Sequence, residues 1–275
     1  MNVNKLTEII KENTTLEVSV QEIQKGNVTR IGISIGIGTV RPILYVKNYE
    51  ELFETLGYEA VARQMLIDAE NAIERQKEEF VNLNNYTSWE YAKENLKLCI
   101  APKGTNEGIV TYPYLDLELY VRVIVTKDGN GQANYKVKLE VLDMWNITKE
   151  QLFQVALDCT KPTYKVQSMS ELLFGFEMEN DPCPMIVINT KDGLHGASVI
   201  YCKEILKEIA DKYDSNLFII PSSIHEIIVK PIDLLVGLDE MTEMVKDVNT
   251  SEVEPEEVLS NHAYIFRKDT MEITW

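Results

Sequence analysis

The spacing of hydrophobic residues changes several times along the chain. Residues 1–15 predict the start of an amphipathic helix, with Leu6, Ile9 and Ile10 on one face. In residues 31–37, isoleucine alternates strictly with glycine and serine, which is the clearest strand pattern in the protein. We therefore predict a β-hairpin from that segment and residues 16–20, followed by a third strand at 43–46. The glycines precede neither Lys-Ser nor Lys-Thr, so they indicate a bulge or a closely packed neighbour instead of a phosphate loop.

Helical spacing follows the third strand. Asn48 and Glu51 have the spacing of a capping box and predict the start of a helix. Gly57 is expected to interrupt that helix, and a long amphipathic helix is predicted over residues 59–80. Another helix is predicted from Thr87 through Leu98.

The rest of the chain mixes both spacings. Residues 109–143 predict a second hairpin, whose turn is Lys127–Gly131. Thr148 with Gln151 and Ser168 with Glu171 are capping pairs that predict two helices. Further predictions are strands at 185–188 and 197–201, a following helix that buries Ile205, Leu206, Ile209 and Ala210, and a helix over 239–248. A helical first turn at Pro255 and a last hairpin from 262–266 and 271–275 complete the prediction.

The mixed order of elements predicts an α+β fold, in which largely antiparallel sheets built from hairpins pack against several amphipathic helices. The Pro102–Asn106 cluster is the best candidate for an internal boundary. It would separate an N-terminal region, 1–104, from a C-terminal region, 105–275. A single continuous domain is the alternative, because 275 residues suit either arrangement.

Composition restricts the classes of partner. The formal net charge is −17, so nonspecific binding to nucleic acid or to anionic lipid is not expected. The charge allows basic proteins or cations as partners, but an acidic excess more often only keeps a protein soluble. No apolar run approaches the roughly 20 residues of a membrane span, and no signal peptide is recognised. The four cysteines contain no CxxC pair and are expected to be reduced, mostly buried thiols. We therefore expect a cytoplasmic protein.

The segment Leu217–Pro231, LFIIPSSIHEIIVKP, predicts two buried strands joined by a polar loop. The loop contains the candidate catalytic residues Ser222, Ser223, His225 and Glu226. A serine nucleophile, a histidine base and an acid would form a hydrolytic site. However, Ser223 and His225 on an extended strand lie about 6–7 Å apart, and no G-x-S-x-G elbow is present. The S-x-x-E spacing of Ser223 and Glu226 favours a structural capped turn.

Other chemistry receives less support. His225-Glu226 lacks the second histidine of H-E-x-x-H, and His195 and His262 are distant in sequence, so neither a metal nor a cofactor is predicted. Asp116 and Glu118 follow the polar face of a strand and are expected to be solvated. Pairing with Arg122, or binding of a cation, is the alternative for these two acids.

An acidic stretch occupies residues 239–257, with eight acids and one lysine. A solvated helical face has this composition, and so does a protein that mimics DNA or docks on a basic partner.

Several strings resemble a bacterial family, the domain of unknown function DUF5688, which we associate with Gram-positive gut anaerobes. They include RPILYVKNYEELFETLGYEAVA, DLELYVRVIV, MWNITKEQLFQVAL, LFIIPSSIHEIIV and VNTSEVEPEEVLSNHAY, and they cover most of residues 40–266. The segment GISIGIGTV is more glycine-rich than the family pattern. The resemblance carries over no activity, cofactor or catalytic residue. It implies an accessory role linked to mobile elements.

Three functional hypotheses follow. The first is a cytoplasmic, non-enzymatic binding or regulatory accessory protein with a protein partner. The second is a hydrolase that uses Ser222 or Ser223 with His225 and Glu226. The third is an acidic mimic or docking protein that uses residues 239–257.

Overall fold

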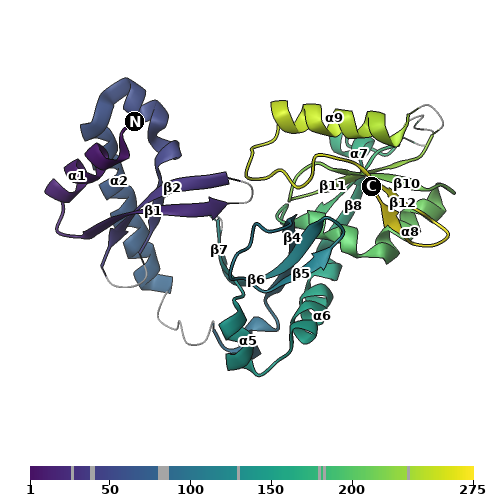
Figure 1. Cartoon of the computed structure of the whole chain (residues 1–275), viewed down its shortest axis with the longest axis horizontal. Helices are drawn as coiled ribbons and strands as arrows, with labels where there is room; N and C mark the ends of the chain where they lie inside the picture. The colour runs from purple at the N-terminus through teal and green to yellow at the C-terminus, as the bar shows by residue number, and fades with distance from the viewer. Residues whose placement is uncertain are drawn as a thin grey trace. The chain divides into compact units, whose positions relative to one another are not determined.

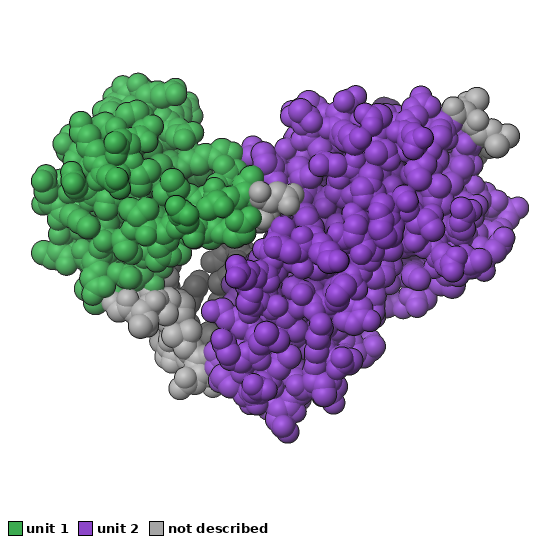
Figure 2. All heavy atoms as spheres, in the orientation of Figure 1, with its two compact units in different colours: residues 1–85 green, residues 86–275 purple. Residues whose placement is uncertain are grey.

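The computed structural model divides the chain into two compact units, residues 1–85 and residues 86–275 (Figure 2). The Pro102–Asn106 cluster, which we considered as a boundary, follows a strand inside the second unit. The residues described are 1–25, 28–37, 41–79, 87–128, 131–178, 181, 184–233 and 236–275.

The first unit combines a three-stranded antiparallel sheet with helices (Figure 1). Its core contains Leu6, Ile33 and Met65, which are fully buried. The predicted hairpin and third strand are confirmed, and residues 26–27 between β1 and β2 lie outside the described residues. Its elements are α1 (Val3–Glu12), β1 (Glu17–Lys25), β2 (Val28–Gly36), β3 (Ile43–Tyr45), the 3-10 helix η1 (Val46–Tyr49) and α2 (Glu50–Glu79).

Two glycines explain the geometry of this unit. A Cβ atom on Gly32 would lie 2.4 Å from Cγ2 of Ile43, so the glycine lets β3 approach β2 closely, as its position in the strand indicated. Gly57 has a φ of 75° and interrupts α2 where the sequence predicted a break. The helix start predicted at Asn48 was wrong, because that residue lies inside η1 and α2 begins two residues later.

In the second unit, one sheet has β6 at its centre. The strand β4 pairs with one edge of β6, while β5 and β7 pair in succession with the other. The elements of this part are α4 (Trp89–Ala92), β4 (Leu96–Pro102), β5 (Thr111–Tyr114), β6 (Leu117–Asp128), β7 (Gly131–Lys136), α5 (Leu139–Trp145), α6 (Lys149–Thr160) and the 3-10 helix η3 (Lys161–Thr163).

The other sheet of this unit has six strands in the order β13-β12-β10-β11-β9-β8, and each neighbouring pair is antiparallel. Leu217 packs in the cluster that includes Leu206 of α8, and Phe218 packs with Met241 and Val245 of α9. Because neighbouring residues of a strand point to opposite faces, α8 and α9 cover opposite faces of β10. The elements are β8 (Tyr164–Ser168), α7 (Met169–Phe174), β9 (Ile186–Thr190), the 3-10 helix η4 (Gly196–Tyr201), α8 (Lys203–Lys212), β10 (Leu217–Pro221), β11 (Ile227–Pro231), α9 (Leu238–Ser251), β12 (Tyr264–Phe266) and β13 (Ile273–Thr274).

The predicted α+β class and largely antiparallel sheets are confirmed. Four local predictions were wrong. Leu98 belongs to β4, because pairing with β6 overrides the helical start at Ser88. The predicted second hairpin ends at Lys136, and α5 follows it. Residues 197–201 form part of η4, and Pro255 lies in a turn. No helix among the described residues is long and apolar enough to cross a membrane.

Candidate functional site

The loop between β10 and β11 is a tightly bonded turn. The strands pair from Leu217 to Pro221, so the predicted pair of buried strands is confirmed. Inside the turn, the backbone N–H of Ser223 donates to the carbonyl oxygen of Glu226 at 3.3 Å. The Oγ of Ser223 accepts from the backbone N–H of His225 at 3.0 Å, two residues on. The serine therefore stabilises the turn, although with a different N–H from the one that the S-x-x-E spacing predicted.

The ring of His225 is held by residues outside the turn. Its Nδ1 accepts a hydrogen bond from the backbone N–H of His195 at 3.1 Å, which places the proton of the neutral ring on Nε2. That Nε2 lies 3.4 Å from Oε1 of Glu257. The structure thus brings together His225, His195 and Glu257.

The two serine hydroxyls lie in separate contacts. Ser222 donates to Oε1 of Glu226 at 3.3 Å, and Oγ of Ser223 is occupied by the backbone of His225. A nucleophile and its base must share a hydrogen bond. Among the described contacts of these residues, no serine hydroxyl bonds to the imidazole ring.

His195 occupies an unusual position beside this turn. It has a left-handed φ of 56°, and only 9% of its surface is exposed. The following N–H, of Gly196, donates to the carbonyl oxygen of His225 at 2.8 Å. Nδ1 of His195 is buried and has no hydrogen-bond partner. Burial, together with the charges of Arg122, His225 and Lys97, lowers the pKa of His195 well below its usual value, so the ring is neutral.

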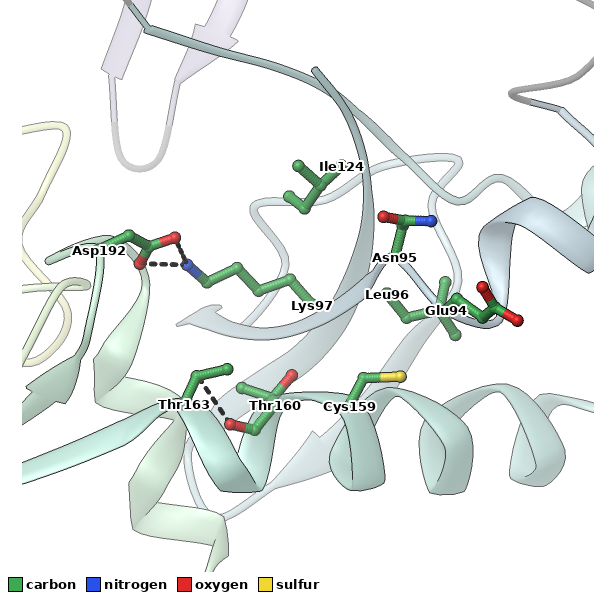
Figure 3. A pocket seen from close by; sticks show the side chains of 9 residues that line it. All are labelled: Glu94, Asn95, Leu96, Lys97, Ile124, Cys159, Thr160, Thr163 and Asp192. Carbon is green, nitrogen blue, oxygen red and sulfur yellow. Dashed lines mark hydrogen bonds and ion pairs between the residues drawn. The ribbon is translucent and has the colours of Figure 1, made fainter. Parts of the chain in front are cut away.

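The segment after β9 that contains His195 also contains Asp192, which forms a buried ion pair with Lys97 of β4. Nζ of Lys97 is 2.7 Å from Oδ1 and 2.9 Å from Oδ2 of Asp192 (Figure 3). Burial opposes ionisation of the carboxyl group, yet hydrogen bonds from Lys97 and Thr190 and the charge of Lys97 lower the pKa of Asp192 well below its usual range. The pair fixes the turn after β9 against β4. Sequence reasoning missed it, although a lysine within the apolar run LKLCIA was a usable signal.

The ion pair borders a pocket of about 240 Å³ (Figure 3). The hydroxyl of Thr160 accepts from the N–H of Leu98 at 2.8 Å and donates to the carbonyl of Ala156. The thiol of Cys159 donates to the carbonyl of Lys93 at 3.1 Å, and burial raises its pKa, so it is a thiol at neutral pH. The lining residues are Glu94, Asn95, Leu96, Lys97, Ile124, Cys159, Thr160, Thr163 and Asp192.

Asp116 and Glu118, which were predicted to be solvated, accept hydrogen bonds from other parts of the chain. Asp116 is in the turn before β6 and accepts from Nε2 of His262 at 2.8 Å and from the hydroxyl of Tyr264 at 2.9 Å. Glu118 is buried and accepts two N–H bonds from Asn106, at 3.0 and 2.8 Å, and one from Gly104 at 3.0 Å. Neither acid pairs with Arg122. Both connect segments distant in the sequence, so the solvated-face prediction was wrong.

Residues that could bind metal are dispersed. No group of three His, Cys, Asp or Glu side chains in the described ranges could hold a metal ion. Cys99, Cys159 and Cys202 are free thiols, and Cys183 lies outside the described residues.

A different kind of feature follows the edge strand β8. Three consecutive apolar residues of α7 and two beyond it are exposed, with Leu173 at 67% and Phe174 and Phe176 at 61% each. The rings of Phe174 and Phe176 lie 6.2 Å apart. We call this region the α7 surface and define it as Val166, Leu172, Leu173, Phe174, Phe176 and Met178.

A small pocket of about 130 Å³ lies beside the α7 surface. Val166 belongs to both. Ile186, Ile209 and Tyr213 give the pocket an apolar part, and Glu171 and Glu177 also line it. Such a depression can hold one side chain of a docked segment.

Comparison with known proteins assigns a family and no activity. The profile described as a family of unknown function, DUF5688, matches residues 2–268. No curated protein matches, and no solved structure matches.

Proposed function

This chain belongs to the DUF5688 family of unknown function, and we propose that it is a non-enzymatic binding protein whose α7 surface docks on a partner protein. The observation that carries the proposal is the exposure of Leu172, Leu173 and Phe174 in succession. Contiguous apolar side chains on a protein surface mark interaction sites, whereas single ones are ordinary. A regulatory, cytoplasmic accessory role in a bacterium, linked to mobile elements, is part of the proposal; its bacterial and accessory parts follow from the family resemblance.

The partner is an extended segment with apolar anchors and flanking Lys or Arg. The strand β8 ends the order of the six-stranded sheet, so it offers a backbone edge to which an extended segment can pair. The α7 surface and the 130 Å³ pocket supply apolar contacts beside that edge. Glu177 of the pocket is paired with Lys212 at 2.9 Å, whereas Glu171 forms no ion pair with any residue that the structure describes. Glu171 and the formal charge of −17 on the chain favour a basic segment.

A displayed library of random extended peptides tests this proposal. We expect peptides selected on the full chain to combine large apolar residues with Lys or Arg. Leu173→Glu/Phe176→Glu should weaken their binding at least about tenfold, because charges would replace apolar side chains that a bound peptide covers. Met144→Glu is the matched control. Met144 is an apolar side chain of α5 that is 72% exposed, and its substitution should leave the affinity unchanged.

Two outcomes would contradict the proposal. One is that the selected peptides bind wild type and the double variant equally. The other concerns a second copy of the chain: a wild-type dimer in light scattering that becomes monomeric in the double variant would assign the α7 surface to self-association.

Helix α9 supports a second candidate, an acidic docking surface for a basic protein. Met241 and Val245 bury one side of the helix, while Asp239, Glu240, Glu243 and Asp247 are exposed. Exposed charge pairs are screened within about 8–10 Å at physiological salt. Binding of a defined basic probe, polylysine, should therefore fall with salt and weaken in Asp239→Asn/Glu240→Gln. Polylysine binding that changes neither with salt nor with these substitutions would exclude α9 as the docking surface.

A further inference from the structure

Three cations form a row across the sheet centred on β6. Lys97 of β4 lies directly opposite Arg122 of β6, and Arg122 lies directly opposite Lys136 of β7. Directly opposed residues share one face of a sheet, with Cβ atoms about 4.5–5.5 Å apart, and like charges in these positions are destabilising. The opposite face carries Leu98 and Val121 of the apolar core. A chain with 44 acids and 27 Lys and Arg has thus concentrated three cations at one place.

Only one end of the row is neutralised by a carboxylate. Lys97 pairs with Asp192. Arg122 donates to Oδ1 of Asn134 and, at 3.4 Å, to the hydroxyl of Tyr120. Lys136 donates to Oδ1 of Asn106 at 2.6 Å. Arg122 also interacts with the thiol of Cys99. In the described part of the chain, the hydrogen bonds of Arg122 and Lys136 therefore go to uncharged partners.

The acid nearest in the strand offsets these charges only in part. Glu118, four residues before Arg122, accepts from three N–H donors of Gly104 and Asn106, and its charge acts on Lys136 in opposition to that of Arg122. Both cations instead lie over the ring of Tyr120, at 5.5 Å for Arg122 and 5.0 Å for Lys136. Burial and the charge of Arg122 lower the pKa of Lys136, which shows that its neighbourhood disfavours a second positive charge.

Two further observations point to a ligand at this row. Nδ1 of His195 is buried without a partner, and His195 is close enough to Arg122 and Lys97 for their charges to lower its pKa. In addition, Lys97 and Ile124 line the pocket of Figure 3, so the row borders open space at its Lys97 end. Ile124 and Arg122 are two residues apart and share a face of β6.

We propose that Arg122 and Lys136 bind an oxyanion, the phosphate or sulfate group of a small ligand. The planar guanidinium presents two parallel N–H donors to such a group, and the ammonium adds a compact charge beside it. A bound oxyanion also offsets the repulsion along the row. Because the net charge of the chain repels anions, attraction must come from this local arrangement.

Isothermal titration of the full chain with inorganic phosphate, at constant ionic strength, tests the site. We expect saturable binding that Arg122→Gln/Lys136→Gln weakens at least about tenfold, since the double variant loses the charge-assisted hydrogen bonds to the oxyanion. The control is Lys165→Gln/Arg267→Gln, which changes the net charge by the same amount. Lys165 lies in β8 and Arg267 directly follows β12, and both are exposed. It should bind phosphate as wild type does.

Wild-type protein alone also tests the proposal, in case the double variant does not fold. Nuclear magnetic resonance of the lysine side chains should show the Lys136 signal, assigned with Lys136→Gln, moving with phosphate concentration. Absence of saturable phosphate binding, or an unmoved Lys136 signal, would overturn the site. Acetate that binds as tightly as phosphate would overturn the assignment to phosphate or sulfate.

Discussion

Among single residues, Asp192 has the clearest energetic role, because it neutralises the buried Lys97. Asp192→Asn should lower the free energy of unfolding at pH 7 by about 3 kcal/mol, the low end for a broken buried pair. The unfolded carboxyl has a pKa of about 3.9 and the folded one lies well below its usual range. The contribution of Asp192 is therefore complete above about pH 5 and is lost as the pH falls.

Urea unfolding at pH 7 and pH 3 measures this effect, and the difference between wild type and Asp192→Asn should shrink at pH 3. Asp211→Asn is the control, because Asp211 forms an exposed pair with Lys207 and should cost less than about 0.5 kcal/mol. Equal losses in the two variants would show that the Lys97–Asp192 pair contributes no more than a surface pair.

His195 should make stability depend on pH in a different range. Its folded pKa is lowered by burial, whereas the unfolded value is about 6.5. The unfolded state therefore binds the proton first, and stability falls as the pH drops below about 6.5. His195→Asn, which suits the left-handed φ, should reduce the slope of unfolding free energy between pH 7.5 and 5.5 by up to about 1.4 kcal/mol per pH unit. An unchanged slope would mean that His195 titrates normally.

Gly196 is required by a close backbone contact. A Cβ atom there would lie 2.6 Å from the carbonyl oxygen of His225 and 2.7 Å from the backbone nitrogen of Thr190. Gly196→Ala should therefore lower the unfolding free energy by about 3 kcal/mol, as measured in urea. Gly237→Ala is the control, because its Cβ would meet nothing within 4 Å, and it should cost less than about 1 kcal/mol. Similar losses would remove the steric argument.

At the scale of elements, β4 is an edge strand. Side chains from later in the chain form hydrogen bonds with the backbone groups of Leu98 that do not pair with β6. Thr160 accepts from the N–H of Leu98, and Ser198 donates to its carbonyl at 2.9 Å. Thr160→Val keeps the shape and leaves that buried N–H unpaired, so it should cost about 1–3 kcal/mol in thermal or urea unfolding. Thr250→Val, on the exposed side of α9, should change stability by less than about 0.5 kcal/mol. Equal effects would contradict the role of Thr160.

The same strand shows which elements the sequence could predict. The capping box of Thr148 and Gln151 is local, and the structure has both of its hydrogen bonds. In contrast, β4 was predicted as a helix because its partners, β6 and Thr160, lie far along the chain. In the candidate site, too, the local feature could be predicted from the sequence and the contact between distant segments could not. The turn at Ser223 was predicted, but the approach of His195 to His225 depends on packing across 30 positions.

At the scale of the whole molecule, the apolar clusters follow the division into two units. The cluster around Leu6, Ile33 and Met65 draws every member from residues 1–85. The clusters around Leu98, Phe218 and Cys99 draw every member from residues 86–275. A unit that has its own core satisfies the main physical requirement for independent folding.

We therefore expect fragments 1–85 and 86–275 to fold separately. The larger fragment has two sheets and an extensive core, so it should unfold cooperatively in urea and keep the near-ultraviolet circular dichroism of its tryptophans, all three of which lie in residues 86–275. The smaller fragment has fewer buried side chains and should have the lower stability of a small domain. The far-ultraviolet spectra of the fragments should sum to that of the full chain. A fragment 86–275 that is unfolded or aggregated would show that its core needs residues 1–85.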